Sequence, residues 1–219
     1  MDGGKKGTGG RLVPFEIEGP AGPLEALLRL PPSPRGAAVI AHPHPLYGGT
    51  MHTKVVHRAA RLLADRFGLA ALRFNFRGVG ASAGSHDGGP GEVDDLVAAA
   101  RRLRQLQPAG PLVLSGFSFG SLRAIEASAL LRPDLLLLLG VPLLRWDRSG
   151  VDGIAGIPVA WVQGEEDEFG GGELARATAS RLGWELQVVP GADHFFTERL
   201  EAFEEAVAEG VASLLPDGR

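Results

Sequence analysis

Residues 111–131, PLVLSGFSFGSLRAIEASALL, decide the fold of this 219-residue chain. The apolar run Leu112–Leu114 predicts a buried strand, and residues Ser118 to Leu131 predict a helix. Between them stands GFSFG, a Gly-x-Ser-x-Gly motif in which the strand runs into a turn and the helix begins at once. Such a turn holds its serine in a strained backbone conformation, with the hydroxyl raised above the edge of a sheet. Ser118 is therefore predicted to be an exposed nucleophile.

A second match to the motif, GASAG at residues 80–84, lacks this context. Ser82 is followed by the Gly-rich stretch Gly84–Gly89, in which no helix can begin. We therefore interpret Ser82 as a solvated loop serine and not as the nucleophile.

Outward from residues 111–131, short apolar runs alternate with longer amphipathic stretches. The predicted strands are Val13–Ile17, Leu24–Leu30, Ala37–Ala41, Leu69–Phe74, Leu112–Leu114, Leu135–Leu139, Ile157–Val162 and Leu186–Val189. The predicted helices are Met51–Phe67, Glu92–Gln107, Ser118–Leu131, Leu174–Leu182 and Glu198–Leu215. This alternation indicates an α/β fold with a mostly parallel central sheet and helices on both faces. We expect a flexible Gly-rich segment at residues 1–10 and a single domain over residues 11–219, because no linker separates two cores.

The composition excludes several classes of function. Apolar residues make up 44% of the chain and charged residues 22%, and the net charge of −4 gives no sign of a nucleic-acid partner. The absence of cysteine excludes disulfides, thiolate nucleophiles and cysteine-based metal sites. The longest apolar run, Leu135–Leu144, is too short for a membrane helix, and the N-terminus has no signal-peptide pattern. We therefore expect a cytoplasmic protein without a membrane partner.

A nucleophilic serine needs a base that removes its proton and a carboxylate that orients the base. His194 lies in the loop between the last predicted strand and the last predicted helix, at the edge where α/β sheets place their chemistry. Asp167 follows the strand Ile157–Val162 in the acidic loop GEEDE. Asp147, after the preceding strand, is the alternative acid.

Hydrolysis also requires two backbone N–H groups that bind the developing oxyanion. Phe119, immediately after the nucleophile, supplies one donor. The second is expected from the loop HPHPLYGG at residues 42–49, in which Pro43 and Pro45 have no N–H. His44 is the first choice for this donor, with Leu46 or Tyr47 as alternatives.

Five segments resemble, in this order, the α/β-hydrolase superfamily: HPHPLYGGT, FNFRGVGASAG, GFSFG, GEEDE and GADHFF. They are most similar to its small, cap-less bacterial members, related to dienelactone hydrolases and prolyl-oligopeptidase-type serine hydrolases. The resemblance extends from about Ala37 to Leu200. It implies the α/β-hydrolase fold, with Ser118, Asp167 and His194 as catalytic residues and the N–H groups of His44 and Phe119 as the oxyanion hole.

The resemblance also sets expectations for the substrate. Only Val141–Gly156 separates two predicted strands where capped members insert a lid, so no cap domain is expected and the site should be open. A small-molecule carboxylic ester, small or short-chain, would be cleaved through an acyl-enzyme without a cofactor or metal. The residues expected to form the substrate-binding walls are Tyr47, Phe117, Trp146, Phe169 and Phe195.

Other functions stay open on the sequence alone. The same triad could serve a peptidase, thioesterase or lactonase, or the chain could be a non-catalytic binding protein of the same fold. The pair His42 and His44 suggests a metal hydrolase, but no acid lies nearby in sequence. The glycines of Gly78–Gly84 suggest a nucleotide site, but no Gly-Lys-Ser/Thr follows them. The sequence leaves the oligomeric state open, with a homodimer as one option.

Overall fold

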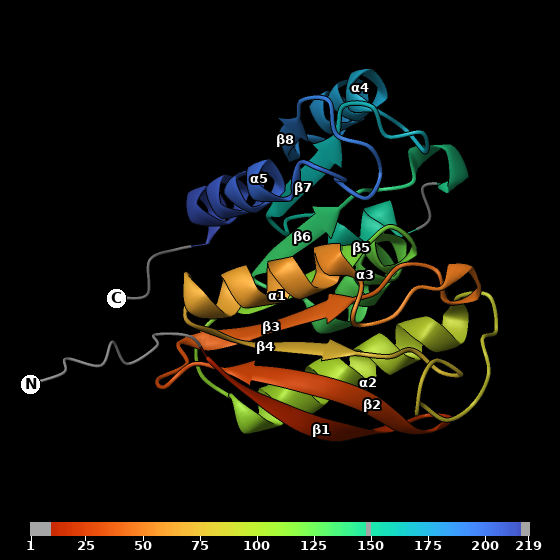
Figure 1. Ribbon diagram of the computed structural model, residues 1–219, viewed down its shortest axis with the longest axis vertical. Helices are drawn as coiled ribbons and strands as arrows, with labels where there is room; N and C mark the ends of the chain where they lie inside the picture. Colours follow the sequence, from red (N-terminus) through yellow and green to blue (C-terminus); the bar gives the residue numbers. More distant parts are fainter. Residues whose placement is uncertain (1–9, 148–149, 216–219) are drawn as a thin grey trace, which may run out of the picture.

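The computed structural model describes residues 10–147 and 150–215, which include an eight-stranded sheet in the order β1-β2-β4-β3-β5-β6-β7-β8 (Figure 1). The strands are β1 (Arg11–Gly19), β2 (Gly22–Leu30), β3 (Gly36–Ala41), β4 (Leu69–Phe74), β5 (Leu112–Phe117), β6 (Leu135–Leu139), β7 (Val159–Gly164) and β8 (Glu185–Val189). The hairpin β1–β2 joins β4 in antiparallel orientation, and every pair from β4 to β8 is parallel. The mostly parallel sheet expected from the sequence is thereby confirmed.

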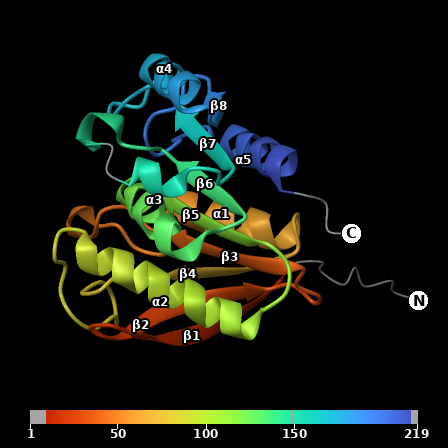
Figure 2. The same ribbon diagram turned by 180° about the vertical axis from the view of Figure 1, so that it is seen from behind.

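Helices cover both faces of this sheet. They are α1 (Lys54–Asp65), α2 (Pro90–Leu106), α3 (Phe119–Leu131), α4 (Gly172–Leu182) and α5 (Leu200–Leu214). Helices α1 and α5 pack against one face, and α2, α3 and α4 against the other, so that two apolar cores form (Figures 1 and 2). The central strands β3, β5 and β6 are buried along their whole length, which explains their continuous apolar runs. No helix within the described residues is long and apolar enough to cross a lipid bilayer.

The parallel register brings the carboxyl ends of four strands to one edge of the sheet. Pairing aligns Ala41 of β3 with Gly116 of β5, and Gly164 of β7 with Val189 of β8. The loops that follow β3, β5, β7 and β8 therefore meet at this edge. They carry the residues that the sequence predicted as oxyanion donors, nucleophile, acid and base.

Several predicted boundaries differ from those of the structure, and two of the differences have a clear local reason. Helix α1 begins at Lys54 and not at Met51, because Met51 lies in a buried turn whose N–H donates to Asn75 Oδ1 at 2.8 Å and whose carbonyl accepts from Arg73 Nη1 at 2.7 Å. Strand β7 begins at Val159 and not at Ile157, because Ile157 N–H closes a turn onto Ile154 O and Pro158 has no N–H to pair.

The N-terminal expectation falls mainly outside the described residues, which begin at Gly10. Gly10 itself is buried, and its N–H donates to Asp65 Oδ1 at 3.0 Å. The connection from β6 to β7 contains, within its described residues, only two short 3₁₀ helices, Leu143–Arg145 and Val151–Ile154. The absence of a cap domain agrees with the short spacing in the sequence.

The interpretation of Ser82 as a solvated residue was wrong. Its side chain is buried, and its Oγ donates to Asn75 O at 2.7 Å and accepts from Glu25 N at 3.0 Å. Ser82 therefore connects the loop after β4 to strand β2. The sequence missed this role because the two partners lie 7 and 57 residues away along the chain.

Replacing Ser82 with alanine is expected to destabilise the fold without removing the chemistry at Ser118. The change leaves one buried carbonyl and one N–H unpaired, which costs about 1–3 kcal/mol in the free energy of unfolding. Urea denaturation of the wild type and Ser82→Ala measures this cost. A difference indistinguishable from zero would contradict the bridging role of the hydroxyl.

Candidate active site

Ser118 stands on a strained turn between β5 and α3. Its backbone has φ 55° and ψ −119°, a region that non-glycine residues rarely adopt. The two glycines of the motif make this turn possible. A Cβ on Gly116 would lie 2.0 Å from Gly120 O, and a Cβ on Gly120 would lie 2.6 Å from Ala41 O. The motif residues thus let the start of α3 approach both β5 and the end of β3.

A chain of hydrogen bonds joins three of the predicted site residues. His194 Nε2 lies 2.8 Å from Ser118 Oγ, and His194 Nδ1 lies 2.7 Å from Asp167 Oδ2. A carboxylate oxygen can only accept, so Nδ1 carries the proton and Nε2 is left to accept the Ser118 hydroxyl proton. The side chains of His194 and Asp167 are buried, which shields this chain from competing water. The arrangement can take a proton from the serine as Oγ attacks.

Asp167 is held by two further donors. Phe169 N–H donates to Oδ1 at 2.8 Å, and Gln163 Nε2 donates to Oδ2 at 2.7 Å. Gln163 is fully buried in β7, and its Oε1 accepts from Val141 N and Trp161 Nε1, both at 2.8 Å. Sequence reasoning missed Gln163. A polar residue within an otherwise apolar, buried parallel strand is the signal that could have found it.

The backbone N–H groups of His44 and Phe119 lie on the two segments that Gly120 brings together. Within the described residues neither group donates a hydrogen bond, and Phe119 is the first residue of α3. The rings of His44 and Phe119 are 4.8 Å apart between centroids. The His44 imidazole caps the short 3₁₀ helix Pro45–Tyr47 by accepting from Leu46 N at 3.2 Å, which fixes the course of this loop. This geometry is compatible with the predicted oxyanion hole.

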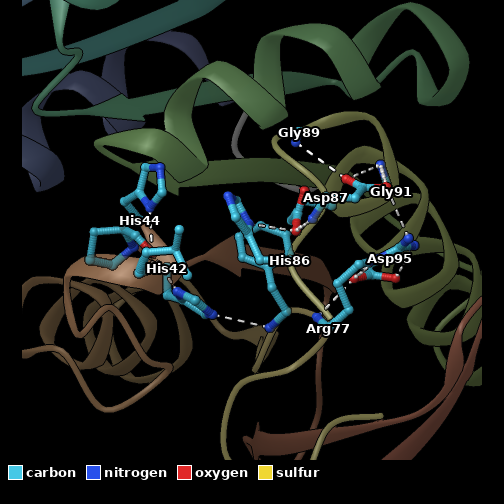
Figure 3. Close-up of polar contacts among 12 residues, drawn as sticks. His42, His44, Arg77, His86, Asp87, Gly89, Gly91 and Asp95 are labelled. Carbon is cyan, nitrogen blue, oxygen red and sulfur yellow. Dashed lines mark hydrogen bonds and ion pairs between the residues drawn. The ribbon is translucent and has the colours of Figure 1, made fainter. Parts of the chain in front are cut away.

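His42 holds the same loop through hydrogen bonds of its ring. Its Nδ1 lies 2.6 Å from Pro43 O and its Nε2 accepts from Phe76 N at 3.0 Å (Figure 3). Both ring nitrogens are therefore used, so His42 and His44 do not form a pair of metal ligands. No cluster of three or more potential ligands that could hold a metal ion occurs within residues 10–147 and 150–215.

The stability of the fold is expected to fall in mild acid because of His42. Burial lowers the pKa of this histidine from 6.5 to about 4. Above pH 6.5 the ring is neutral in both states; as the pH falls from 6.5 toward 4, the unfolded chain binds a proton that the folded chain does not. The loss amounts to about 3 kcal/mol.

Urea midpoints at about pH 7.5 and about pH 4.5 measure this dependence. His42→Gln keeps an acceptor for Phe76 N–H but does not titrate, so its stability should change less between the two pH values. Equal changes in both proteins would contradict the assignment to His42.

The loop between β4 and α2 braces this side of the site (Figure 3). Arg77 donates from Nε and Nη2 to the two carboxylate oxygens of Asp95, at 3.0 and 2.8 Å. His86 is largely buried, with Nδ1 2.8 Å from Glu92 Oε1 and its ring 5.0 Å from that of His44. Burial, His86 and Arg123 together lower the pKa of His44. Burial and the neighbouring positive charge thus favour the neutral form of His44.

A cleft of about 610 Å³ opens beside Ser118. The residues that line it are His44, Tyr47, Gly88, Ser118, Phe119, Leu122, Arg123, Pro142, Arg145 and Phe169. Tyr47 and Phe169 line this cleft, and their contact with a substrate stays a prediction. Arg123 and Arg145 were missed, although a cation five residues after the nucleophile in an apolar helix was a signal.

The other three predicted wall residues do not line this cleft. Phe117 is fully buried beneath His194, with ring centroids 5.1 Å apart, because it is the last residue of β5 and points into the core. Trp146 packs its ring 6.0 Å from that of Trp184, where the two indoles stack. Phe195 is 50% exposed and lies 5.3 Å from the His194 ring, outside the set of lining residues. Phe117 is thus a packing residue, and its prediction as a substrate contact was wrong; substrate contact by Trp146 and Phe195 stays a prediction.

The strained elbow and the Ser–His–Asp chain above a mostly parallel sheet define an α/β hydrolase. The chain belongs to the alpha/beta hydrolase domain family, whose model matches residues 35–211. An uncharacterised protein of Rickettsia prowazekii is 35% identical over 204 residues, which cover 87% of this chain and 85% of that protein.

Two solved structures of α/β serine hydrolases are also similar to this chain. An α/β serine hydrolase without a lid from Xanthomonas campestris is 35% identical, with a TM-score of 0.85 over 95% of this chain and 97% of its own. An α/β serine hydrolase homologue from Coxiella burnetii is 34% identical, with a TM-score of 0.83 over 91% of this chain and 97% of its own. The lid-less fold is thus shared along almost the whole length.

Proposed function

We propose that this protein is a serine hydrolase that cleaves small or short-chain carboxylic esters through an acyl-enzyme. The observation that carries the proposal is the unbroken hydrogen-bonded chain from Ser118 through His194 to Asp167 on a strained elbow. Each link has the donor and acceptor that nucleophilic catalysis requires.

In the first half-reaction Ser118 Oγ attacks the ester carbonyl carbon while His194 Nε2 takes the hydroxyl proton. The negative charge on the carbonyl oxygen is stabilised by the N–H groups of His44 and Phe119. The intermediate then collapses, the bond to the alcohol oxygen breaks, and His194 gives its proton to the leaving alcohol. Asp167 stays ionised and stabilises the imidazolium.

In the second half-reaction water attacks the acyl-Ser118 carbonyl and gives a proton to His194 Nε2. Collapse of this second intermediate returns the proton to Ser118 and releases the carboxylic acid. Since no cap covers the cleft, acyl groups of different size can enter, and we expect modest selectivity along an acyl-chain series. Esters are favoured over amides because an alkoxide leaves with less help from a proton donor than an amine does.

A fluorophosphonate probe tests the proposal directly, because it forms a stable adduct only with an activated serine. One adduct per chain is expected, mapped by peptide mass spectrometry to Ser118. Ser82→Ala is the matched control, since it alters the other Gly-x-Ser-x-Gly motif and should keep the adduct under conditions where it is folded. No adduct on the wild type would favour a non-catalytic binding protein, and an adduct on another serine would overturn the assignment.

The class of substrate is tested separately with a panel of aryl esters, thioesters, lactones and aminoacyl amides. Aryl esters are expected to give the highest kcat/KM. A higher value for any other class on the same labelled serine would replace esterase activity with that chemistry and leave the triad in place.

A further inference from the structure

The cleft beside Ser118 has a cation on its inner wall. Arg123 lies on α3, five residues after Ser118, a rise of about 7 Å along a helix. Its side chain is only 11% exposed, and its guanidinium carbon lies 4.8 Å from the centroid of the Phe119 ring. Arg123 is thus held next to the residue whose N–H we assign to the oxyanion hole.

The guanidinium has more donors than its protein partners use. Nη2 donates to Glu126 Oε1 at 2.7 Å, and Nε is buried with no hydrogen-bond partner within the described residues. A guanidinium carries five N–H donors in a planar fork that matches a carboxylate. Because Nε is buried, a carboxylate in the cleft would be bound by the terminal N–H groups that Glu126 does not use.

A second cation lies on another part of the cleft. Arg145 ends the 3₁₀ helix Leu143–Arg145, and its exposed side chain lines the cleft. Leu122, Pro142 and Phe169 supply apolar lining, and no Asp or Glu side chain is among the described lining residues. The cleft therefore combines positive charge with apolar surface. Arg123 also helps to lower the pKa of His44, as expected of a cation close to that ring.

We propose that the preferred substrates are esters that carry a second, ionised carboxylate, which Arg123 and Arg145 bind while Ser118 attacks the ester carbonyl. The inference rests on the proposed function and names its substrate class. Two cations and no carboxylate are among the described residues that line the cleft, which favours a substrate with an anionic group. Ser118, Arg123 and Arg145 line the same cleft, so a single substrate can contact all three.

A matched pair of substrates tests the proposal. One is the mono-4-nitrophenyl ester of adipic acid, and the other is the same compound with its free carboxylate methylated. The wild type is expected to turn over the charged ester with about tenfold higher kcat/KM, the worth of one charge-assisted hydrogen bond. Added salt should reduce this ratio, because it screens the attraction at the exposed Arg145.

Variants identify the cations responsible. Arg123→Gln is expected to bring the ratio of charged to neutral kcat/KM close to one, and Arg145→Gln to lower it partly. Glu126→Gln removes the competing negative charge and should raise the ratio. Arg101→Gln on the exposed surface of α2 is the control, with both rates unchanged. If Arg123→Gln folds poorly, a lower ratio in Arg145→Gln and a higher ratio in Glu126→Gln still show that the cleft selects a charged substrate.

The possible outcomes separate this inference from the proposed function. Equal turnover of both esters by the wild type would overturn the inference that the substrate is anionic. A ratio of charged to neutral kcat/KM that is unchanged in Arg123→Gln, Arg145→Gln and Glu126→Gln would do the same. In both cases the proposed esterase activity would stand. Turnover of neither ester, with no fluorophosphonate adduct, would overturn the proposed function and this inference with it. The inference is supported if the ratio of charged to neutral kcat/KM falls in Arg123→Gln and Arg145→Gln, rises in Glu126→Gln and is unchanged in Arg101→Gln.

Discussion

Ser118→Ala is expected to lower kcat for an aryl ester by roughly 10⁴- to 10⁶-fold. Without the Oγ no acyl-enzyme can form, so the variant keeps only what the N–H donors and the cleft contribute to direct attack by water. Alanine keeps the Cβ, so the strained φ of 55° is retained and the surrounding structure should not change. Kinetics with a 4-nitrophenyl ester measure the loss of activity, and circular dichroism checks that the structure is unchanged.

The control for this experiment is again the second motif. Ser82→Ala should retain kcat within a few-fold of the wild type but lose stability. Ser118→Ala should retain the stability of the wild type but lose kcat. Retention of burst kinetics by Ser118→Ala would mean that another residue is acylated. Such a result would remove Ser118 from the mechanism, whatever the geometry of the elbow.

The sequence predicts the sheet well where strands are buried on both faces. The predicted bounds Leu69–Phe74 and Leu135–Leu139 agree with β4 and β6, because both strands are buried along their whole length and are apolar apart from Arg73. The end of β5 was underestimated, since Ser115 and Gly116 look like loop residues although their backbones pair with β3 and β6. Sequence polarity does not show where a ladder of backbone hydrogen bonds stops.

The candidate triad was predictable for a related reason. In a parallel sheet the loops after successive strands emerge at one edge, so the order of strands and loops places Ser118, Asp167 and His194 together without knowledge of side-chain directions. The walls of the cleft depend on those directions. Phe117 and Phe119 flank the same serine, yet the first points into the core and the second lines the cleft.

Roles that depend on partners distant in sequence were not predictable. The sequence predicted a solvated Ser82 because glycines surround it, but the residue is buried and makes hydrogen bonds to the backbones of Asn75 and Glu25. Gln163 lies just beyond the predicted strand Ile157–Val162, and its amide links Asp167 to the backbone of Gly170 at 2.9 Å. Both residues act through tertiary contacts, which neither periodicity nor a short motif reports.

These tertiary contacts favour Asp167 over Asp147 as the proposed acid. Asp167 accepts from three N–H donors, of which two reach Oδ2 and one reaches Oδ1. Each donor stabilises the ionised form and fixes the plane of the carboxylate. Asp147, the alternative, is exposed after the 3₁₀ helix Leu143–Arg145. An exposed carboxylate interacts only weakly with a cation, because water competes.

Asp167→Asn is accordingly expected to lower kcat by roughly 10³- to 10⁴-fold. The amide has one acceptor atom in place of two, so it cannot serve His194, Gln163 and Phe169 together. If its oxygen faces His194, its NH₂ opposes Phe169 N–H; if its NH₂ faces His194, the imidazole is driven into the tautomer that cannot take the serine proton. In both orientations the negative charge that stabilises the imidazolium is lost.

Asp147→Asn is the matched control, because the same carboxylate-to-amide change is made in the neighbouring loop. It should retain kcat near the wild-type value, and both variants should bind a product carboxylate with similar affinity, since neither residue lines the cleft. The steady-state kcat of the two variants decides between the acids. A large loss in Asp147→Asn together with retained activity in Asp167→Asn would transfer the role to Asp147, and would mean that the 2.7 Å contact between Asp167 and His194 is only structural.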